Sequence, residues 1–204
     1  MNDDLLKELL NEANNIETQK IICVIDVQND FIDGALRNEE AIKVVPNIVK
    51  YLEENVGKAK IIYTKDTHDS GYLNTQEGEK LPVPHCVVGT LGQDLNYDVE
   101  KAIRKYGIEN IEAIVKFSFG ADWENWEEAI DMLFDNTPSR LASNLEFEFV
   151  GFCTDICVIS NILMVKAMYP EAKVSCLSSL CAGVTPEKHA AALEVMRSCQ
   201  IEVK

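Results

Sequence analysis

A cysteine at the point where a buried strand would run into a helix is the strongest chemical signal in this sequence. Residues 147–152 are mostly aromatic or β-branched around Gly151, and the apolar residues from Val158 onward recur at helical spacing. Cys157 would then lie near a helix start, where free N–H groups and the helix dipole favour a thiolate. This place in an α/β fold suits a nucleophile. The segment alone fits a buried structural cysteine equally well.

Two further ionisable residues end predicted strands. Asp26 ends the apolar run that begins at Lys20, and Lys116 ends the run within residues 108–116. Groups at the ends of buried strands are partly desolvated, so their proton affinity is open to tuning. An aspartate beside Cys157 could take the thiol proton, and a lysine would offset the negative charge that the pair must share. The alternative is an Asp–Lys salt bridge at the sheet edge with a bystander cysteine.

A second group of candidates lies in the long segment 66–96, which has little periodicity. Asp66 and His68 would point to one face of an extended chain, and Glu77 and His85 follow in the same segment. A carboxylate with two imidazoles suits a divalent metal such as Zn²⁺, with coordination positions left for water or substrate. A loop of this length in a compact domain is usually functional. The alternative is a pair of solvated loop histidines.

The remaining chemical residues carry weaker signals. His189 lies beside alanines on a late predicted helix and is interpreted as a surface or packing residue. Cys153 precedes Cys157 by four residues, which leaves redox chemistry as a minor alternative, although thiol oxidoreductases use a Cys-x-x-Cys spacing. The other five cysteines are interpreted as inert core thiols: Cys23, Cys86, Cys176, Cys181 and Cys199.

The elements that must position these residues follow from an alternation of strand and helix patterns. Predicted strands are 20–26, 60–65, one within 108–116, 145–151, 173–177 and 200–203. Predicted helices are a short leading one at 5–10, one with Pro46 in its first turn that ends near Glu54, 97–106, 123–134, 156–168 and 186–198. This order predicts an α/β fold with a mostly parallel sheet and helices on both faces, in which ligands bind beyond the carboxyl ends of the strands. We expect residues 1–204 to form one domain.

Composition narrows the classes of function. A formal net charge of −15 argues against nucleic acid and anionic membranes as partners. No apolar run is long enough to span a membrane, and the N-terminal residues lack the basic start of a signal peptide. The odd number of cysteines, 7, favours reduced thiols over a disulfide framework. We therefore expect a cytoplasmic protein.

Four segments, in order along nearly the whole chain, resemble the isochorismatase-like cysteine hydrolases and within them the nicotinamidase-related branch. Residues 24–31 (VIDVQNDF) resemble the opening strand of that family, and Val115-Lys116 resembles its lysine segment. Residues 151–158 (GFCTDICV) resemble its nucleophile segment. The Asp-x-His at 66–68 and the His-Cys at 85–86 resemble the metal loop of nicotinamidases.

The resemblance implies a three-layer α/β/α domain with a six-stranded parallel sheet. It implies a catalytic triad of Asp26, Lys116 and Cys157. It also implies an oxyanion hole built from backbone N–H groups near Cys153, Thr154 and Cys157, with a cis peptide at Cys153–Thr154.

For the metal loop, the resemblance implies one divalent ion, expected to be Zn²⁺, held by Asp66, His68 and His85. Typical nicotinamidases have another histidine soon after the Asp-x-His, and here Glu77 is the expected replacement. Phe31 matches an aromatic residue that faces the substrate ring. The Trp or Phe that usually precedes the second metal histidine is missing, because residues 81–84 read LPVP.

We therefore predict a metal-assisted cysteine amidohydrolase that cleaves a small, nicotinamide-like carboxamide to the acid and ammonia through a thioester. A carbamoyl-type amide hydrolase of the same family is one alternative, and a non-catalytic metal or redox protein using Cys153 and Cys157 is another. Ether-cleaving isochorismatases lack the nucleophilic cysteine, so its presence argues against that chemistry. The expected partners are a small-molecule amide and further copies of the chain in a homo-oligomer, with no nucleic acid or membrane.

Overall fold

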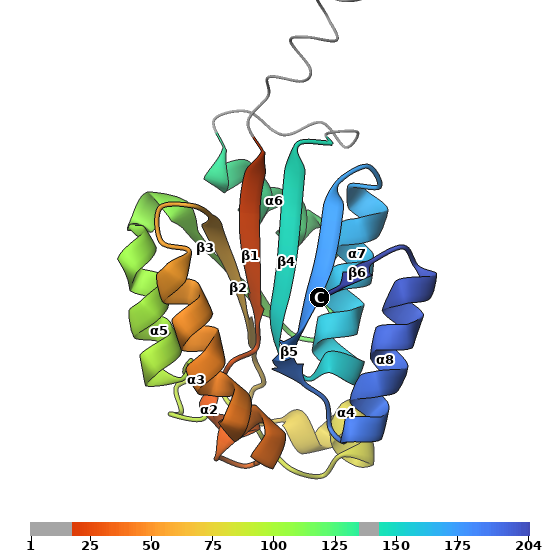
Figure 1. Cartoon of the computed structure of the whole chain (residues 1–204). Helices are drawn as coiled ribbons and strands as arrows, with labels where there is room; N and C mark the ends of the chain where they lie inside the picture. The colour runs from red at the N-terminus through yellow and green to blue at the C-terminus, as the bar shows by residue number, and fades with distance from the viewer. Residues whose placement is uncertain (1–17, 135–142) are drawn as a thin grey trace, which may run out of the picture.

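Six parallel strands form one sheet, with the strand order β3-β2-β1-β4-β5-β6 (Figure 1). The computed structural model describes residues 18–134 and 143–204, so the helix expected at 5–10 lies outside the described residues. The strands are β1 (Gln19–Ile25), β2 (Lys60–Asp66), β3 (Ile111–Lys116), β4 (Leu145–Phe152), β5 (Lys173–Ala182) and β6 (Glu202–Val203). The predicted α/β fold with a six-stranded sheet is confirmed.

Alternate residues of β1 build the two hydrophobic cores. Ile21, Cys23 and Ile25 belong to the core on one face of the sheet, and Ile22 and Val24 belong to the core on the other. Successive side chains of a strand point to opposite faces, so a central strand covered on both sides must be apolar at every position. This explains the continuous apolar run that the sequence shows there.

Helices cover both faces of the sheet and make the three predicted layers (Figure 1). One face is covered by α3 (Glu39–Glu54) and α5 (Tyr97–Ile103), and the other by α6 (Trp123–Leu133), α7 (Ile159–Met168) and α8 (Pro186–Ser198). Among the described residues, no helix combines the length and apolarity that crossing a bilayer requires.

The start of α3 differs from the prediction. Pro46 lies inside the helix rather than in its first turn. The helix begins seven residues earlier because the side chain of Asn38 accepts hydrogen bonds from the backbone N–H groups of Glu40 and Ala41. Glu39 and Glu40 add negative charge in the first turn, which the helix dipole favours.

Other elements also differ in their bounds. The segment 66–96 contains two short helical pieces, a 3₁₀ turn (Tyr72–Asn74) and α4 (Gln76–Lys80), and α2 (Asn29–Ile32) follows β1. Two more 3₁₀ turns precede β3, at Arg104–Tyr106 and Ile108–Asn110. Strand β5 runs five residues past its predicted end, and its register with β4 shifts between Phe149 and Gly151. Such a bulge accommodates extra residues in one strand of a pair.

The sheet places the strand ends where chemistry is expected. The chain winds outward from β1 through β2 to β3 and, on the other side, from β4 through β5 to β6, so the strand order reverses between β1 and β4. Asp26 follows β1, and Cys157 follows β4. Doubly wound sheets bind ligands at such a reversal, beyond the carboxyl ends of the strands. In Figure 1 this is the lower edge of the sheet, beneath which α2 and α4 lie.

Gly151 allows β4 to approach β1 at this edge. Its φ is +119°, a region that is essentially restricted to glycine, and it pairs with Ile25. A Cβ atom at position 151 would lie 2.1 Å from the carbonyl oxygen of Ile25, which is backbone and cannot swing aside.

We predict that Gly151→Ala lowers the free energy of unfolding by about 3 kcal/mol or more, because backbone strain and a steric clash act together. Gly57→Ala is the matched control, since Gly57 has a φ of +74° but open space around its Cβ position. Strain alone should cost about 1–2 kcal/mol there. Urea denaturation of both variants measures the difference, and equal losses would show that the approach of β4 to β1 tolerates a side chain.

Candidate active site

Three strand ends bring Asp26, Lys116 and Cys157 together, as the sequence predicted. The Nζ atom of Lys116 lies 2.7 Å from Oδ2 of Asp26 and 3.7 Å from Sγ of Cys157. All three side chains are buried. Asp26 adopts a positive φ of 47° directly after β1, and its backbone N–H donates to the hydroxyl of Thr64 on β2 (3.1 Å). That hydroxyl in turn donates to Oδ1 of Asp26 (2.6 Å), which fixes the carboxylate in place.

Burial sets the resting charges of this group. Burial raises the pKa of the Cys157 thiol well above its usual value, and the nearby Asp26 adds to the effect. Burial also raises the pKa of Asp26, against the lowering influence of Lys116. Burial alone would lower the pKa of Lys116, but Asp26, Cys157 and Asp66 raise it. The resting site therefore holds a thiol and an ammonium, so attack by Cys157 requires a base, and Asp26 is adjacent.

The turn that carries Cys157 differs from the expected helix start. Residues Thr154–Val158 form one π-helical turn, and α7 begins only at Ile159. The N–H groups of Ile156 and Val158 both donate to the carbonyl of Cys153, at 3.0 Å. Cys157 is therefore buried within a widened turn, and desolvation outweighs the thiolate stabilisation that the sequence pattern predicted.

The cis peptide also lies one bond earlier than expected. It joins Phe152 and Cys153, at the junction where β4 ends, and not Cys153 and Thr154. Of the predicted oxyanion-hole residues, Cys153 follows the cis bond directly, and Thr154 and Cys157 lie on the π-helical turn that comes next.

A cavity of about 830 Å³ opens beside the nucleophile. Its wall includes Cys157 and Cys153, together with Phe31, the predicted ring-facing residue. Leu81 lines the cavity in the segment that lacks the expected aromatic residue, and Phe119 contributes from the loop after β3. Thr154, by contrast, does not line the cavity and is fully buried.

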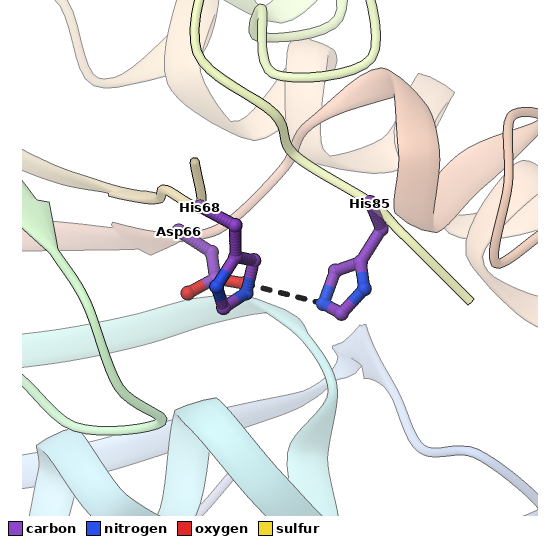
Figure 2. A group of neighbouring side chains, drawn as sticks. All are labelled: Asp66, His68 and His85. Atoms are coloured by element: carbon purple, nitrogen blue, oxygen red, sulfur yellow. Dashed lines mark hydrogen bonds and ion pairs between the residues drawn. The ribbon is translucent and has the colours of Figure 1, made fainter. Parts of the chain in front are cut away.

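Asp66, His68 and His85 converge next to the cavity (Figure 2). The Oδ2 atom of Asp66 lies 3.0 Å from Nε2 of His68 and 3.5 Å from Nε2 of His85. One ligand atom from each residue lies within 4.8 Å of the other two. Oε1 of Glu77 is 3.8 Å and 3.7 Å from the same two imidazole nitrogens. The structure therefore brings all four predicted metal residues together.

Hydrogen bonds orient the side chains of this cluster. Nδ1 of His85 lies 2.8 Å from the carbonyl oxygen of Val83, so its N–H can donate there and hold the ring with Nε2 toward Asp66. Metal-binding histidines are commonly oriented in this way. Burial opposes ionisation of Asp66, but hydrogen bonds with His68 and His85 hold the pKa of its carboxyl well below the usual range. An anionic carboxylate with imidazole lone pairs is a ligand set for a divalent ion.

One lysine connects the two groups. The Nζ atom of Lys116 lies 3.2 Å from Oδ1 of Asp66 as well as 2.7 Å from Asp26. Register explains this, because Asp66 and Lys116 are partners across β2 and β3. The candidate nucleophile, base and metal ligands thus share a single buried cation.

Several positioning residues were missed by sequence reasoning. Gln28 is fully buried, and its side chain forms hydrogen bonds with both the N–H (2.8 Å) and the carbonyl (2.9 Å) of Asp66. Asn161 is also fully buried and donates to the carbonyl of Cys157 (2.7 Å) while accepting from the N–H of Ala121 (2.9 Å). Asn161 shows only as a polar residue within an apolar stretch, whereas Gln28 stands among other polar residues and carries no local signal.

Tyr72 was missed as well. It lies in the segment where another histidine was expected, and it is almost fully buried. Its ring packs edge-on against His68 and His85, with ring centroids 4.6 Å and 5.0 Å apart. Its hydroxyl donates to the carbonyl of Leu81 (2.9 Å), so the same ring supports the imidazoles and the cavity wall.

The other cysteines follow the prediction with one exception. Cys23, Cys86, Cys176 and Cys181 are buried, whereas Cys199 is exposed. The prediction of a core position for Cys199 is wrong, because this residue follows the end of α8 in a surface turn and does not continue the buried face of that helix.

This chain is similar to known proteins in sequence and in fold. Residues 20–113 match the family model of the isochorismatase domain. The chain is 28% identical to a nicotinamidase/pyrazinamidase of Mycobacterium tuberculosis over 193 residues, which covers 90% of this chain and 97% of that relative. It is also 28% identical to a nicotinamidase of Schizosaccharomyces pombe, covering 89% and 91% of the two chains.

A solved structure agrees with the sequence relatives in fold. The crystal structure of a pyrazinamidase from Pyrococcus horikoshii in complex with zinc superposes with a TM-score of 0.71 at 24% identity, covering 91% of this chain and 98% of that one. Together with the match to the family model, these likenesses support the isochorismatase-like family, and within it the nicotinamidase-related branch.

We predict that Lys116→Met lowers the free energy of unfolding by about 3–5 kcal/mol at neutral pH, because two buried carboxylates lose their cation. The pKa of Asp26 would then rise further in the folded state. A group with a raised pKa in the folded state loses its contribution to stability as the pH rises through that pKa. The deficit of the variant should therefore shrink as the pH is lowered toward the acid range.

The matched control for this prediction is Lys43→Met, which removes an exposed pair with Glu40 (2.8 Å). It should leave the free energy of unfolding close to that of the parent, because an exposed ion pair is screened by solvent. Urea denaturation of both variants and the parent protein between neutral and acidic pH gives the comparison. A deficit in Lys116→Met that is independent of pH would contradict the argument.

Proposed function

We propose that this protein is a cysteine amidohydrolase that converts a small, nicotinamide-like carboxamide to the carboxylic acid and ammonia. The observation that carries the proposal is the contact of buried Asp26, Lys116 and Cys157 beside a cavity that a cluster of metal ligands also borders. The activities named for the relatives from M. tuberculosis and S. pombe support the same chemistry.

In the first half of the proposed reaction, Sγ of Cys157 attacks the amide carbonyl carbon as Asp26 takes the thiol proton. The C–S bond forms, and the carbonyl electron pair moves to oxygen. We assign the stabilisation of this oxyanion to backbone N–H groups of Cys153, Thr154 and Cys157, which is commonly the largest catalytic contribution. The C–N bond then breaks as Asp26 returns the proton to nitrogen, and ammonia leaves a thioester behind.

In the second half, Asp26 takes a proton from a water molecule whose oxygen attacks the thioester carbonyl. The C–S bond breaks, the acid is released, and the proton returns to the sulfur of Cys157. Lys116 stays charged throughout, since its pKa is raised, and it limits the repulsion between the carboxylate of Asp26 and negative charge on the sulfur.

We propose that Asp66, His68 and His85 hold one divalent ion, Zn²⁺, with Glu77 as a fourth ligand. When bound, such an ion supplies a Lewis acid at the edge of the cavity, able to orient a substrate nitrogen or a water. The zinc complex of the P. horikoshii pyrazinamidase supports the choice of metal.

The cavity wall bears on the choice of substrate. Phe31 can face one side of a ring, but Leu81 offers an aliphatic surface in place of an aromatic one. An aromatic stack is worth about 0.5–1.5 kcal/mol beyond burial, so its loss weakens nicotinamide binding by about tenfold. This observation favours a second candidate, a carbamoyl-type or other small amide cleaved by the same residues.

We further propose that residues 1–204 act as one domain, in the cytoplasm, and as a homo-oligomer. All seven cysteines lie in the described residues and none forms a disulfide, which suits a reducing compartment.

Ammonia release from a panel of amides that includes nicotinamide tests the proposal. We predict that Cys157→Ala lowers kcat by a factor of about 10⁴ or more, as loss of a covalent nucleophile does. Cys153→Ala should keep substantial activity because its backbone N–H is unchanged. Circular dichroism of both variants checks the fold.

Full activity in Cys157→Ala would refute a cysteine mechanism. Equal inactivity of both variants would favour the redox alternative, because only a dithiol requires both sulfur atoms. No release from nicotinamide, by a protein that hydrolyses another amide in the panel, would reassign the substrate and leave the mechanism standing.

A separate prediction concerns the metal. Elemental analysis of purified protein should find one divalent ion per chain, and Glu77→Gln should retain it less well after dialysis against chelator than the parent does. Glu79→Gln is the matched control, because Glu79 lies on the same short helix but is exposed. Absence of metal at any loading, with activity unaffected by chelator, would refute the metal site.

A further inference from the structure

His189 contacts the turn that carries the candidate nucleophile. Its Nδ1 atom lies 2.8 Å from the hydroxyl oxygen of Thr154, and the two share a hydrogen bond. Thr154 is fully buried and opens the π-helical turn that ends just past Cys157. His189 comes from α8, a helix 35 residues further along the chain. A buried hydroxyl on the turn of the nucleophile is thus satisfied by a side chain from another element.

The connection from β5 to α8 holds the same turn at a second point. Oδ1 of Asp155 accepts a hydrogen bond from the backbone N–H of Val184 (2.8 Å). Gly183 is so tightly enclosed that a Cβ atom there would lie 2.8 Å from Oδ1 of Asp155 and 2.9 Å from the Cβ of His189. The turn is thus tied by one hydrogen bond to α8 and by another to the connection before it, with close packing between the two.

The reacting groups lie immediately on either side of these contacts. Cys153 precedes Thr154 and Cys157 follows Asp155 by two residues, and both cysteines line the cavity. Neither Thr154 nor His189 is among the residues that line it, so the side chains of this pair are not placed to touch a substrate. Any influence of this pair on the reaction must pass through the geometry of the turn.

We infer that His189 is a positioning residue that sets the nucleophile turn through Thr154, so that Sγ of Cys157 and the neighbouring backbone N–H groups meet the carbonyl in one geometry. The inference rests on the proposed function for its kinetic readout. A displacement of about 1 Å in a catalytic group can cost about 100-fold in rate, so a single hydrogen bond at this point has a large effect.

Kinetics of His189→Ala and His189→Asn test the inference. The amide of Asn can occupy the place of Nδ1 and keep the hydrogen bond. We expect His189→Ala to lower kcat by about 10–100-fold with little change in KM, and His189→Asn to restore most of the loss. Glu194→Ala, an exposed change on the same helix, is the matched control and should leave kcat unchanged. Parent-like kcat in His189→Ala would overturn the inference.

Thr154→Val, which keeps the shape but removes the hydroxyl, provides the second arm. It should lose as much kcat as His189→Ala, and the double variant should lose no more, because both changes remove one interaction. Losses that multiply in the double variant would overturn the inference. If His189→Ala does not fold, Thr154→Val against Thr154→Ser decides, and equal kcat in those two would also overturn it.

Alkylation by iodoacetamide gives a readout that needs no substrate. The rate of modification at Cys157, resolved from the other cysteines by mass spectrometry, should be slower in His189→Ala and recover in His189→Asn. If the parent hydrolyses no amide but shows this pattern, the proposed function fails and the inference stands. If the parent hydrolyses an amide, but neither the alkylation rate at Cys157 nor kcat changes when His189 is replaced, the inference fails and the function stands.

Discussion

The buried ammonium of Lys116 is the interaction on which the site depends. It lies 2.7 Å from Asp26, 3.2 Å from Asp66 and 3.7 Å from the sulfur of Cys157. Two carboxylates could not remain ionised so close together in a desolvated pocket without a cation. Lys116 therefore makes two different sites compatible, a base beside a thiol and an anionic ligand beside two imidazoles. Hydrogen bonds hold the two carboxylates in place, with Thr64 on Oδ1 of Asp26 and Gln28 on the backbone of Asp66.

The geometry of the parallel strands places Lys116 beside its partners. Asp66 and Lys116 are register partners at the ends of β2 and β3, and Asp26 leaves β1 one residue after Ile25 pairs with Gly151. The close approach that Gly151 permits brings the end of β4 against β1, and the π-helical turn then presents Cys157 at the same edge. Each functional side chain is thus held by an element whose other residues belong to one of the two cores.

Sequence reasoning succeeded where one local pattern carries the information. Apolar runs that stop at Asp26 and Lys116 gave the strand ends, and Thr185 followed by Pro186 marks the start of α8, whose bounds were predicted without error. It failed where the partner is distant. The roles of Gln28, Asn161 and His189 depend on residues 35 or more positions away, or on two segments at once. The π-helical turn has no distinct hydrophobic period, so the pattern predicted an ordinary helix.

The central position of β1 has a consequence for how the protein is made. Residues 19–25 pair with residues 145–151, so the innermost strand is synthesised first yet must wait for more than half of the chain before its second neighbour exists. Contacts between such distant segments form slowly, because the chain loses the entropy of a long loop before the contacts can stabilise it. The base and the metal ligands precede this closure in the chain, and the thiol arrives with it. Assembly of the complete group of reactive side chains therefore coincides with completion of the sheet, and in a partly folded chain the base and the thiol remain apart.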